Sequence, residues 1–313
     1  MKIKHNVIHV YILLLLVSGC GENPLTPQPE VGPIVFTSTR DGKEQIYAMN
    51  EDGSNITRIT RSDFSNFNPR WSRDGKSIVF NSRRSANIHF RAIVMADANG
   101  DNERVLLEHG LWPVFSPTGD KIAFSYDTLL PGFGTPYDIV IYDLKTDETY
   151  MFKKDSSSND IINDWSPNGK YLLITKRITK LINQKSETHH QIFLIDVETG
   201  IEIQLAGGRF CNWGKFSPDG RAIVFACSDS STGGRDIFTI NIDGSNKKNL
   251  TKSPGMHEFS ATWSSDGRKI AYLAADEGFS RYHIFIINSD GTDKRCLMDD
   301  EFEITSIDWR WNQ

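Results

Sequence analysis

The sequence lacks the excess of basic residues that nucleic-acid-binding domains usually carry. Its 35 Lys and Arg residues stand against 40 Asp and Glu, which gives a formal net charge of −5. This balance excludes nucleic acid as the expected partner, and solubility alone explains the acidic excess. The chain is not short of apolar residues, since 38% of its 313 residues are hydrophobic. That share is ample for a packed core and excludes a disordered chain.

Catalytic motifs are lacking as well. There is no Gly-x-Ser-x-Gly elbow, and His257-Glu258 is followed by Phe259-Ser260-Ala261 instead of the pattern of a zinc-binding helix. Turns such as Glu51-Asp52-Gly53 lack the remaining loop ligands of a calcium site, so a hairpin turn is the better interpretation. We therefore expect no catalytic residue, no metal site and no cofactor, and a binding protein in preference to an enzyme.

The apolar run at the N-terminus, residues 7–17, is too short to span a bilayer. It follows Lys2 and Lys4, which is the layout of a secretory signal. It ends in Val17-Ser18-Gly19-Cys20, which resembles the lipobox of bacterial lipoproteins. The resemblance implies that residues 1–19 are a signal peptide and that the Cys20 sulfur carries a diacylglycerol. The alternative is an ordinary secretory signal with a Cys there by chance.

Residues 20–32 then comprise the lipidated Cys and a linker that contains Pro24, Pro27 and Pro29. Cleavage removes two lysines and changes the formal charge from −5 to −7. Gly21, not Asp, follows the Cys, which among lipoproteins implies sorting to the outer membrane of a host with two membranes. We therefore expect a lipid-anchored protein of the cell envelope, on the periplasmic face of the outer membrane or at the cell surface.

A unit of one aromatic residue, a tight turn and a short β-branched strand recurs along the rest of the chain. In the first copy, Trp71-Ser72-Arg73-Asp74-Gly75 leads into Ile78-Val79-Phe80, with Ser and Gly at the positions that such turns favour. The anchor aromatics are Trp71, Phe115, Trp165, Phe216 and Trp263, which lie 44, 50, 51 and 47 residues apart. A period in this range indicates a repeat architecture.

Each repeat contains four strand signals, which we name a to d in chain order. Strand a ends at the anchor aromatic, strand b is the β-branched run, and strand c is a run such as Asp236-Ile237-Phe238-Thr239-Ile240. A hairpin turn such as Asn50-Glu51-Asp52-Gly53 leads into a short strand d. Six copies of strand c predict six sheets. Four-stranded antiparallel sheets at this period are typical of the blades of a β-propeller.

The two chain ends are expected to complete one blade together. Pro33-Ile34-Val35-Phe36-Thr37 is a strand of type b with no strand a before it, and Ile304 to Trp309 is a strand of type a with no strand b after it. We therefore predict an all-β fold over residues 33–313. It is a six-bladed β-propeller of four-stranded antiparallel blades, with the ring closed by N-terminal strands b–d and C-terminal strand a. We expect it to be a monomer.

Two of these patterns also carry a resemblance to a known family. Trp-Ser-x-Asp-Gly-Lys-x-Ile-x-Phe at residues 71–80 and Ile-Tyr-x-Met-Asn-x-Asp-Gly-Ser at residues 46–54 resemble the repeats of TolB-like propellers, which are WD-repeat-like. The resemblance covers residues 33–311 and implies the propeller fold. TolB itself is a periplasmic partner of the Tol–Pal envelope system. The same blade serves many unrelated tasks, so the resemblance alone does not fix a function.

The two faces of such a ring differ in kind. The a–b and c–d turns share one face and are uniform, whereas the b–c loops and d–a connections share the other and vary, at residues 127–136, 175–190, 228–235 and 274–282. We call the second face the variable-loop face and expect partner binding there, because binding usually sits on variable loops of a rigid scaffold. Arg and aromatic residues anchor interfaces. The predicted partner-binding residues are Arg83, Arg84, His89, Phe133, Arg235, His257, Phe279 and Arg281. The alternative is that several of them pack under their own loops.

Two cysteines flank the Ser217-Pro218-Asp219-Gly220 hairpin at equal distance from its centre, Cys211 before it and Cys227 after it. We therefore expect them to be cross-strand neighbours within reach of a disulfide, which an envelope compartment would permit. Two buried thiols are the alternative, and the register of the strands decides between them.

These observations predict a lipid-anchored cell-envelope propeller that binds a protein, peptide or glycan partner through the variable-loop face. One alternative is a propeller enzyme acting on a polysaccharide, a lyase or a hydrolase. That function would require carboxylates, His or Lys to converge on the axis with perturbed pKa values. Another is a purely structural envelope component, whose variable-loop face would have no concave pocket.

Overall fold

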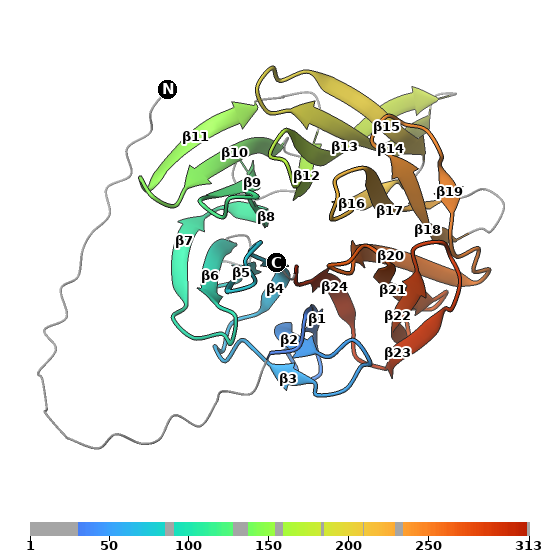
Figure 1. The fold of residues 1–313 in the computed structure, drawn as a ribbon, viewed down its shortest axis with the longest axis horizontal. Coiled ribbons are helices and arrows are strands. Elements are labelled where there is room, and N and C mark those ends of the chain that lie inside the picture. Colours follow the sequence, from blue (N-terminus) through green and yellow to red (C-terminus); the bar gives the residue numbers. More distant parts are fainter. Residues whose placement is uncertain are drawn as a thin grey trace, which may run out of the picture.

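The computed structural model describes residues 31–84, 91–127, 137–153, 159–182, 185–208, 210–228 and 234–311. Its strands form sheets arranged in a ring around a common centre (Figure 1). Each sheet runs from an inner strand near the centre to an outer strand at the rim (Figure 1). Within these described ranges, no helix is long and apolar enough to cross a membrane.

Four sheets contain four antiparallel strands each. The first consists of β24 (Ile304–Trp309), β1 (Ile34–Ser38), β2 (Gln45–Met49) and β3 (Thr57–Arg58). The second consists of β4 (Asn66–Trp71), β5 (Ser77–Ser82), β6 (Ala92–Asp97) and β7 (Arg104–Glu108). The third consists of β8 (Gly110–Phe115), β9 (Lys121–Asp127), β10 (Tyr137–Asp143) and β11 (Glu148–Lys153). The fourth consists of β12 (Asn159–Trp165), β13 (Tyr171–Ile182), β14 (Lys185–Asp196) and β15 (Glu202–Gly208).

The remaining eight strands belong to one continuous sheet. They are β16 (Asn212–Phe216), β17 (Ala222–Ser228), β18 (Arg235–Asn241), β19 (Lys248–Asn249), β20 (Met256–Trp263), β21 (Lys269–Asp276), β22 (Tyr282–Asn288) and β23 (Arg295–Asp300). Strand β18 joins β20 through a parallel pairing of Arg235 with His257. The prediction of six separate four-stranded blades is therefore wrong, because the described residues form four such blades and one eight-stranded sheet.

The length of one outer strand explains the larger sheet. Strand β19 has two residues and pairs with β18 only at Phe238 and Thr239, so the Arg235 end of β18 stays open for β20. Gly234 permits the approach, because a Cβ there would lie 2.3 Å from the Met256 carbonyl oxygen. The period of the sequence does not reveal this pairing, since it depends on where a short strand stops.

The ends of the described chain meet in the first sheet. Strand β24 pairs antiparallel with β1, which places Trp309 opposite Ile34 and Asp308 opposite Val35. The Arg310 N–H donates a hydrogen bond of 2.7 Å to the carbonyl of Pro33. The expected closure, with strand a from one end of the chain and strands b–d from the other, is therefore present.

A side-chain network explains why the tight turns share the Ser-x-Asp-Gly pattern. The Ser72 hydroxyl donates to Asp74 Oδ1 at 2.6 Å and accepts from the Ser77 N–H at 3.0 Å. Gly75 has a φ of 67°, a left-handed conformation that favours glycine. The same bond recurs in later turns, from Ser217 to Asp219 and from Ser264 to Asp266.

The inner strands are bulged, and the bulge sets the direction of the residues that follow it. The pairing of β4 with β5 shifts register between Phe67 and Arg70, and β8, β12, β16 and β20 have equivalent shifts. Bulges re-aim side chains. The anchor aromatic after the bulge packs into the core between neighbouring sheets, as Trp71 does against Val35 and Ile46. The residue before the anchor is turned toward the centre of the ring.

Candidate binding site

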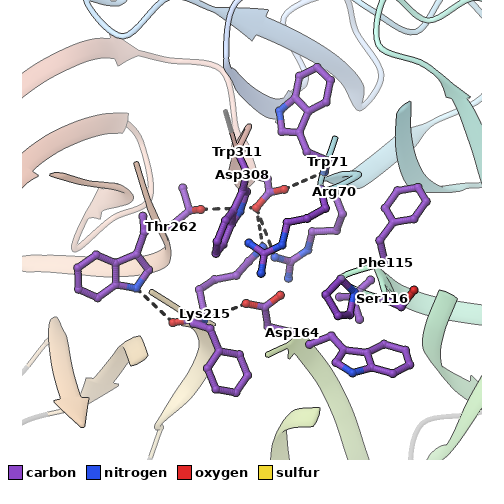
Figure 2. A pocket seen from close by; sticks show the side chains of 15 residues that line it. Arg70, Trp71, Phe115, Ser116, Asp164, Lys215, Thr262, Asp308 and Trp311 are labelled. Atoms are coloured by element: carbon purple, nitrogen blue, oxygen red, sulfur yellow. Dashed lines mark hydrogen bonds and ion pairs between the residues drawn. The ribbon is translucent and has the colours of Figure 1, made fainter. Parts of the chain in front are cut away.

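The ends of the six inner strands line a pocket at the centre of the ring, which we call the axial pocket, and one lining residue of each strand projects toward the axis (Figure 2). Each of these axis-facing residues directly precedes the aromatic residue that ends its strand. They are Arg70, Val114, Asp164, Lys215, Thr262 and Asp308. Ser116 and Pro117 from a tight turn also line the pocket. The axial pocket therefore lies at the tight-turn end of the strands, opposite the variable-loop face.

Asp308 is the most connected of these side chains (Figure 2). Its Oδ1 atom lies 2.5 Å from Lys215 Nζ and 3.7 Å from Arg70 Nη1. Its Oδ2 atom accepts a 2.9 Å hydrogen bond from the Trp71 N–H. Only 5% of the Asp308 side chain and 10% of that of Lys215 are exposed, so the pair is desolvated and held by several partners at once.

Asp164 has a different environment. Its Oδ2 atom accepts a 2.9 Å hydrogen bond from the Phe216 N–H on the next inner strand. Burial raises the pKa of Asp164 to about 6, and the charge of Arg70 offsets part of that effect. Asp164 and Asp308 thus tie the inner strand of one sheet to the anchor aromatic of the next. Asp164 also places a titratable carboxyl group with a perturbed pKa at the axis.

Arg73 and Trp311 complete the wall of the axial pocket. The Arg73 guanidinium carbon lies 3.3 Å from the centroid of a Trp311 ring, which is a cation–π contact. Burial lowers the pKa of Arg73. These two side chains come from a tight turn and from the segment after β24.

Sequence reasoning missed this pocket, although the sequence contains a signal for it. The anchor aromatics were identified, and the residue before each anchor is polar or charged in five of six inner strands, as in Arg70, Asp164 and Asp308. Strict strand alternation does not predict that all six point to one place. The bulge before each of them changes the direction of the chain, and bulges are not visible in the repeat pattern.

On the variable-loop face, the structure brings three of the predicted residues together. The Arg235 guanidinium carbon lies 5.2 Å from the ring centroid of Trp213 and 5.6 Å from that of Phe259. The His257 ring stacks on Phe279 with centroids 5.1 Å apart and planes inclined by 7°. Since Arg235 and His257 are strand partners, these five side chains form one group, which we call the Arg235 patch. Phe279 is 44% exposed.

On one side of the Arg235 patch lie further basic residues, grouped around His190. Burial lowers the pKa of His190, and the nearby charges of Arg177, Arg235 and His189 lower it further. The His190 ring meets Phe210 edge to face, with centroids 5.7 Å apart. Within the described part of the chain, no ion pair joins Arg235 to a carboxylate. The patch therefore presents a cation and aromatic rings without a neutralising acid.

The other predicted residues are not part of this group. Three of the arginines have carboxylate partners of their own: Arg83 with Glu44 at 3.3 Å, Arg84 with Glu103, and Arg281 with Asp299 at 2.8 Å. Arg83 and Arg84 follow β5 and so belong to a different sheet from the Arg235 patch. Cys20, His89 and Phe133 lie outside the described residues.

Cys211 and Cys227 lie at the variable-loop end of β16 and β17. The structure records a disulfide between them, with Cα atoms 4.0 Å apart. Both side chains are buried. Cys296 is a free, exposed cysteine in β23.

The sequence of this chain matches a known protein family and several known proteins. A family model described as the TolB β-propeller domain matches residues 24–129 and 90–306. The Tol-Pal system protein TolB of Desulfosudis oleivorans is 47% identical over 51 residues, which are 16% of this chain and 12% of that protein. An uncharacterized protein of Agrobacterium fabrum is 34% identical over 101 residues, 32% of this chain and 34% of its own. The chain thus spans much less than two thirds of these relatives.

Solved structures give the same fold. TolB from Acinetobacter baumannii superposes with a TM-score of 0.73 at 20% identity, over 90% of this chain and 67% of that one. An oligogalacturonate lyase in complex with manganese has a TM-score of 0.53 at 16% identity, over 87% of this chain and 74% of that one. At these identities the likeness concerns the fold alone. Because the family model spans more than half of the chain, this protein belongs to the TolB β-propeller family.

Proposed function

We propose that this protein is a lipid-anchored component of the cell envelope that binds a protein partner through its variable-loop face. The lipobox-like Val17-Ser18-Gly19-Cys20 supports the anchor. Membership of a family whose relatives include Tol-Pal system proteins supports an envelope location and a protein partner. The likeness to those relatives covers a small part of their length, so the partner of this chain need not be theirs.

The observation that carries the proposal is the Arg235 patch. Arg235 lies over two aromatic rings without an ion-pair partner among the described residues, and the stacked His257 and Phe279 extend this surface to solvent. Arg and aromatic side chains are the types that dominate binding energy at interfaces. A desolvated guanidinium without a carboxylate gains most from a partner that supplies one.

Site-directed photo-crosslinking in the native envelope tests the proposal. A photoreactive residue at Phe279 on the variable-loop face should give a discrete adduct with a partner protein. The matched control is the same residue at Lys170, an exposed position beside a tight turn on the opposite face. An adduct at position 170 with none at 279 would place the interface on the wrong face for this proposal.

A second candidate function, an enzyme acting on a polysaccharide, is favoured by one observation. Asp164 sits at the axis with its pKa raised to about 6, near Arg70 and Lys215, which is the kind of tuned carboxyl group that acid–base catalysis uses. The fold likeness to an oligogalacturonate lyase suggests acidic oligosaccharides as substrates to try. This candidate would be supported if the protein released products from oligogalacturonate and the Asp164→Asn variant did not. Equal turnover by the variant would exclude Asp164 as the catalytic group.

A further inference from the structure

The axial pocket contains one cation whose charge has no close counterion. Lys215 and Arg70 both approach Asp308, at 2.5 Å and 3.7 Å. Asp164 uses an oxygen to accept the Phe216 N–H. Among the described residues, Arg73 forms no ion pair, and its Nη1 atom is buried without a hydrogen-bond acceptor. Buried donors are usually satisfied in folded proteins, so this N–H is available to an acceptor that enters the pocket.

A second donor lies in the same pocket. Arg70 donates from Nη2 to the Asn163 carbonyl at 2.9 Å, whereas its buried Nη1 atom faces Asp308 Oδ1 at 3.7 Å, beyond hydrogen-bond distance, and donates no hydrogen bond. The pocket therefore contains two guanidinium groups with an unused N–H each. Its formal charges are three cations, Arg70, Arg73 and Lys215, against two carboxylates. That balance favours one additional negative charge.

Arg73 also departs from the repeat. It occupies the second position of the first Ser-x-Asp-Gly turn, where the later turns have Pro117, Pro167, Pro218 and Ser265. Turn geometry does not require an arginine, because the other turns form without one. The side chain is instead placed over the Trp311 ring, where it faces the axial pocket.

We propose that the axial pocket binds a single carboxylate carried on an apolar or aromatic body, with Arg73 and Arg70 as its hydrogen-bond donors. A guanidinium matches the planar fork of a carboxylate. The nearby Asp164 and Asp308 would repel a dianionic phosphate. The Trp311 ring lines the pocket and provides contact area for a flat apolar body, whereas the rings of Trp71 and Phe115 are buried in the cores between the sheets (Figure 2). This site is separate from the Arg235 patch, since it lies at the opposite end of the strands.

Binding of phenylacetate tests the proposal, with neutral phenylacetamide as the uncharged analogue of the same shape. Titration followed by NMR chemical shifts of the tryptophan indole N–H groups should show saturable binding of phenylacetate, with a dissociation constant in the millimolar range expected of so small a ligand. Phenylacetamide should bind at least roughly tenfold more weakly, because it cannot form charge-assisted hydrogen bonds. Inorganic phosphate should not displace phenylacetate at equal concentration.

Two variants and one control connect the binding to the pocket. Arg73→Gln should weaken phenylacetate binding at least roughly tenfold, and Trp311→Leu should weaken it as well. Arg268→Gln, which removes an exposed arginine next to another tight turn, should leave it unchanged. Far-ultraviolet circular dichroism confirms that each variant is folded. Equal binding by folded Arg73→Gln, equal binding of phenylacetamide, displacement by phosphate, or no saturable binding would each overturn the proposal. The binding of a partner protein to the variable-loop face is tested by the crosslinking experiment, and its outcome does not depend on phenylacetate binding.

Discussion

Asp164 shows how a single buried residue links the repeat to stability. Its carboxylate accepts the Phe216 N–H, yet burial raises its pKa from 3.8 to about 6. The folded state therefore holds the proton more strongly than the unfolded chain does. The contribution of this group to the free energy of unfolding is greatest below about pH 4 and falls as the pH rises to about 6.

Asp164→Asn retains an acceptor for the Phe216 N–H and removes the titration. We expect the variant to be more stable than the parent at pH 7, by about 1–3 kcal/mol, with the difference vanishing toward pH 4. Urea unfolding between pH 4 and 8 measures it. Asp52→Asn is the matched control. Hydrogen bonds from Ser54 lower the pKa of Asp52, so this substitution should change the stability at pH 7 in the opposite direction. A variant that is no more stable than its parent at pH 7 would contradict this prediction.

The cysteine pair gives a second prediction for individual residues. Blocking of free thiols in the unfolded, non-reduced Cys20→Ser variant should label Cys296 and leave Cys211 and Cys227 unlabelled. Reduction should lower the free energy of unfolding by roughly 3 kcal/mol in the chain-entropy model. Three labelled thiols would show that the two cysteines are not bonded in the purified protein.

For single residues, the sequence pointed to the anchor aromatic of each inner strand but not to the residue before it. Trp71 was identifiable because an aromatic residue followed by Ser-x-Asp-Gly recurs at a constant period. Arg70 was not, because its direction depends on a bulge that leaves no mark in the pattern. For Arg235 the sequence predicted only part of the surroundings. Its place on the variable-loop face was expected, but its contacts with the aromatic residues Trp213 and Phe259 were not.

Among the elements, β24 and β1 matter most for the integrity of the ring, because they join its two ends. Deletion of residues 304–313 would remove β24 and expose the edge of β1 along Ile34 to Ser38. It would also remove Asp308, and with it the ion pairs to Lys215 and Arg70. We expect the truncated protein to aggregate, since an exposed strand edge pairs with other chains.

Size-exclusion chromatography and thermal unfolding test this expectation, with Trp311→Leu as a control that retains β24. A soluble, monomeric truncation that unfolds cooperatively would contradict the importance of the closure. The closure itself could be predicted from the sequence, because the unpaired strand types at the two ends are visible there. The eight-stranded sheet could not, since the pairing of Arg235 with His257 depends on the shortness of β19 and on the close approach at Gly234.

For the molecule as a whole, the first question is how it is held in the cell. We expect Cys20→Ser to release the protein from the membrane fraction and to block cleavage by lipoprotein signal peptidase, because the thiol is the site of acylation in the lipobox resemblance. Fractionation and the mass of the mature N-terminus measure both effects. Cys296→Ser is the control and should leave anchoring intact. Unchanged membrane association of Cys20→Ser would contradict the lipid anchor.

We expect the partner to bind the variable-loop face and not the face of the tight turns. The affinity of the crosslinked partner for purified variants tests this expectation most directly. Phe279→Ala and Arg235→Gln should each cost about 2 kcal/mol or more in binding free energy, which is roughly a 30-fold rise in Kd. Lys170→Ala and Asp290→Ala, next to the tight turns, should change Kd little. If only the tight-turn substitutions weaken binding, the assignment of the binding face is contradicted.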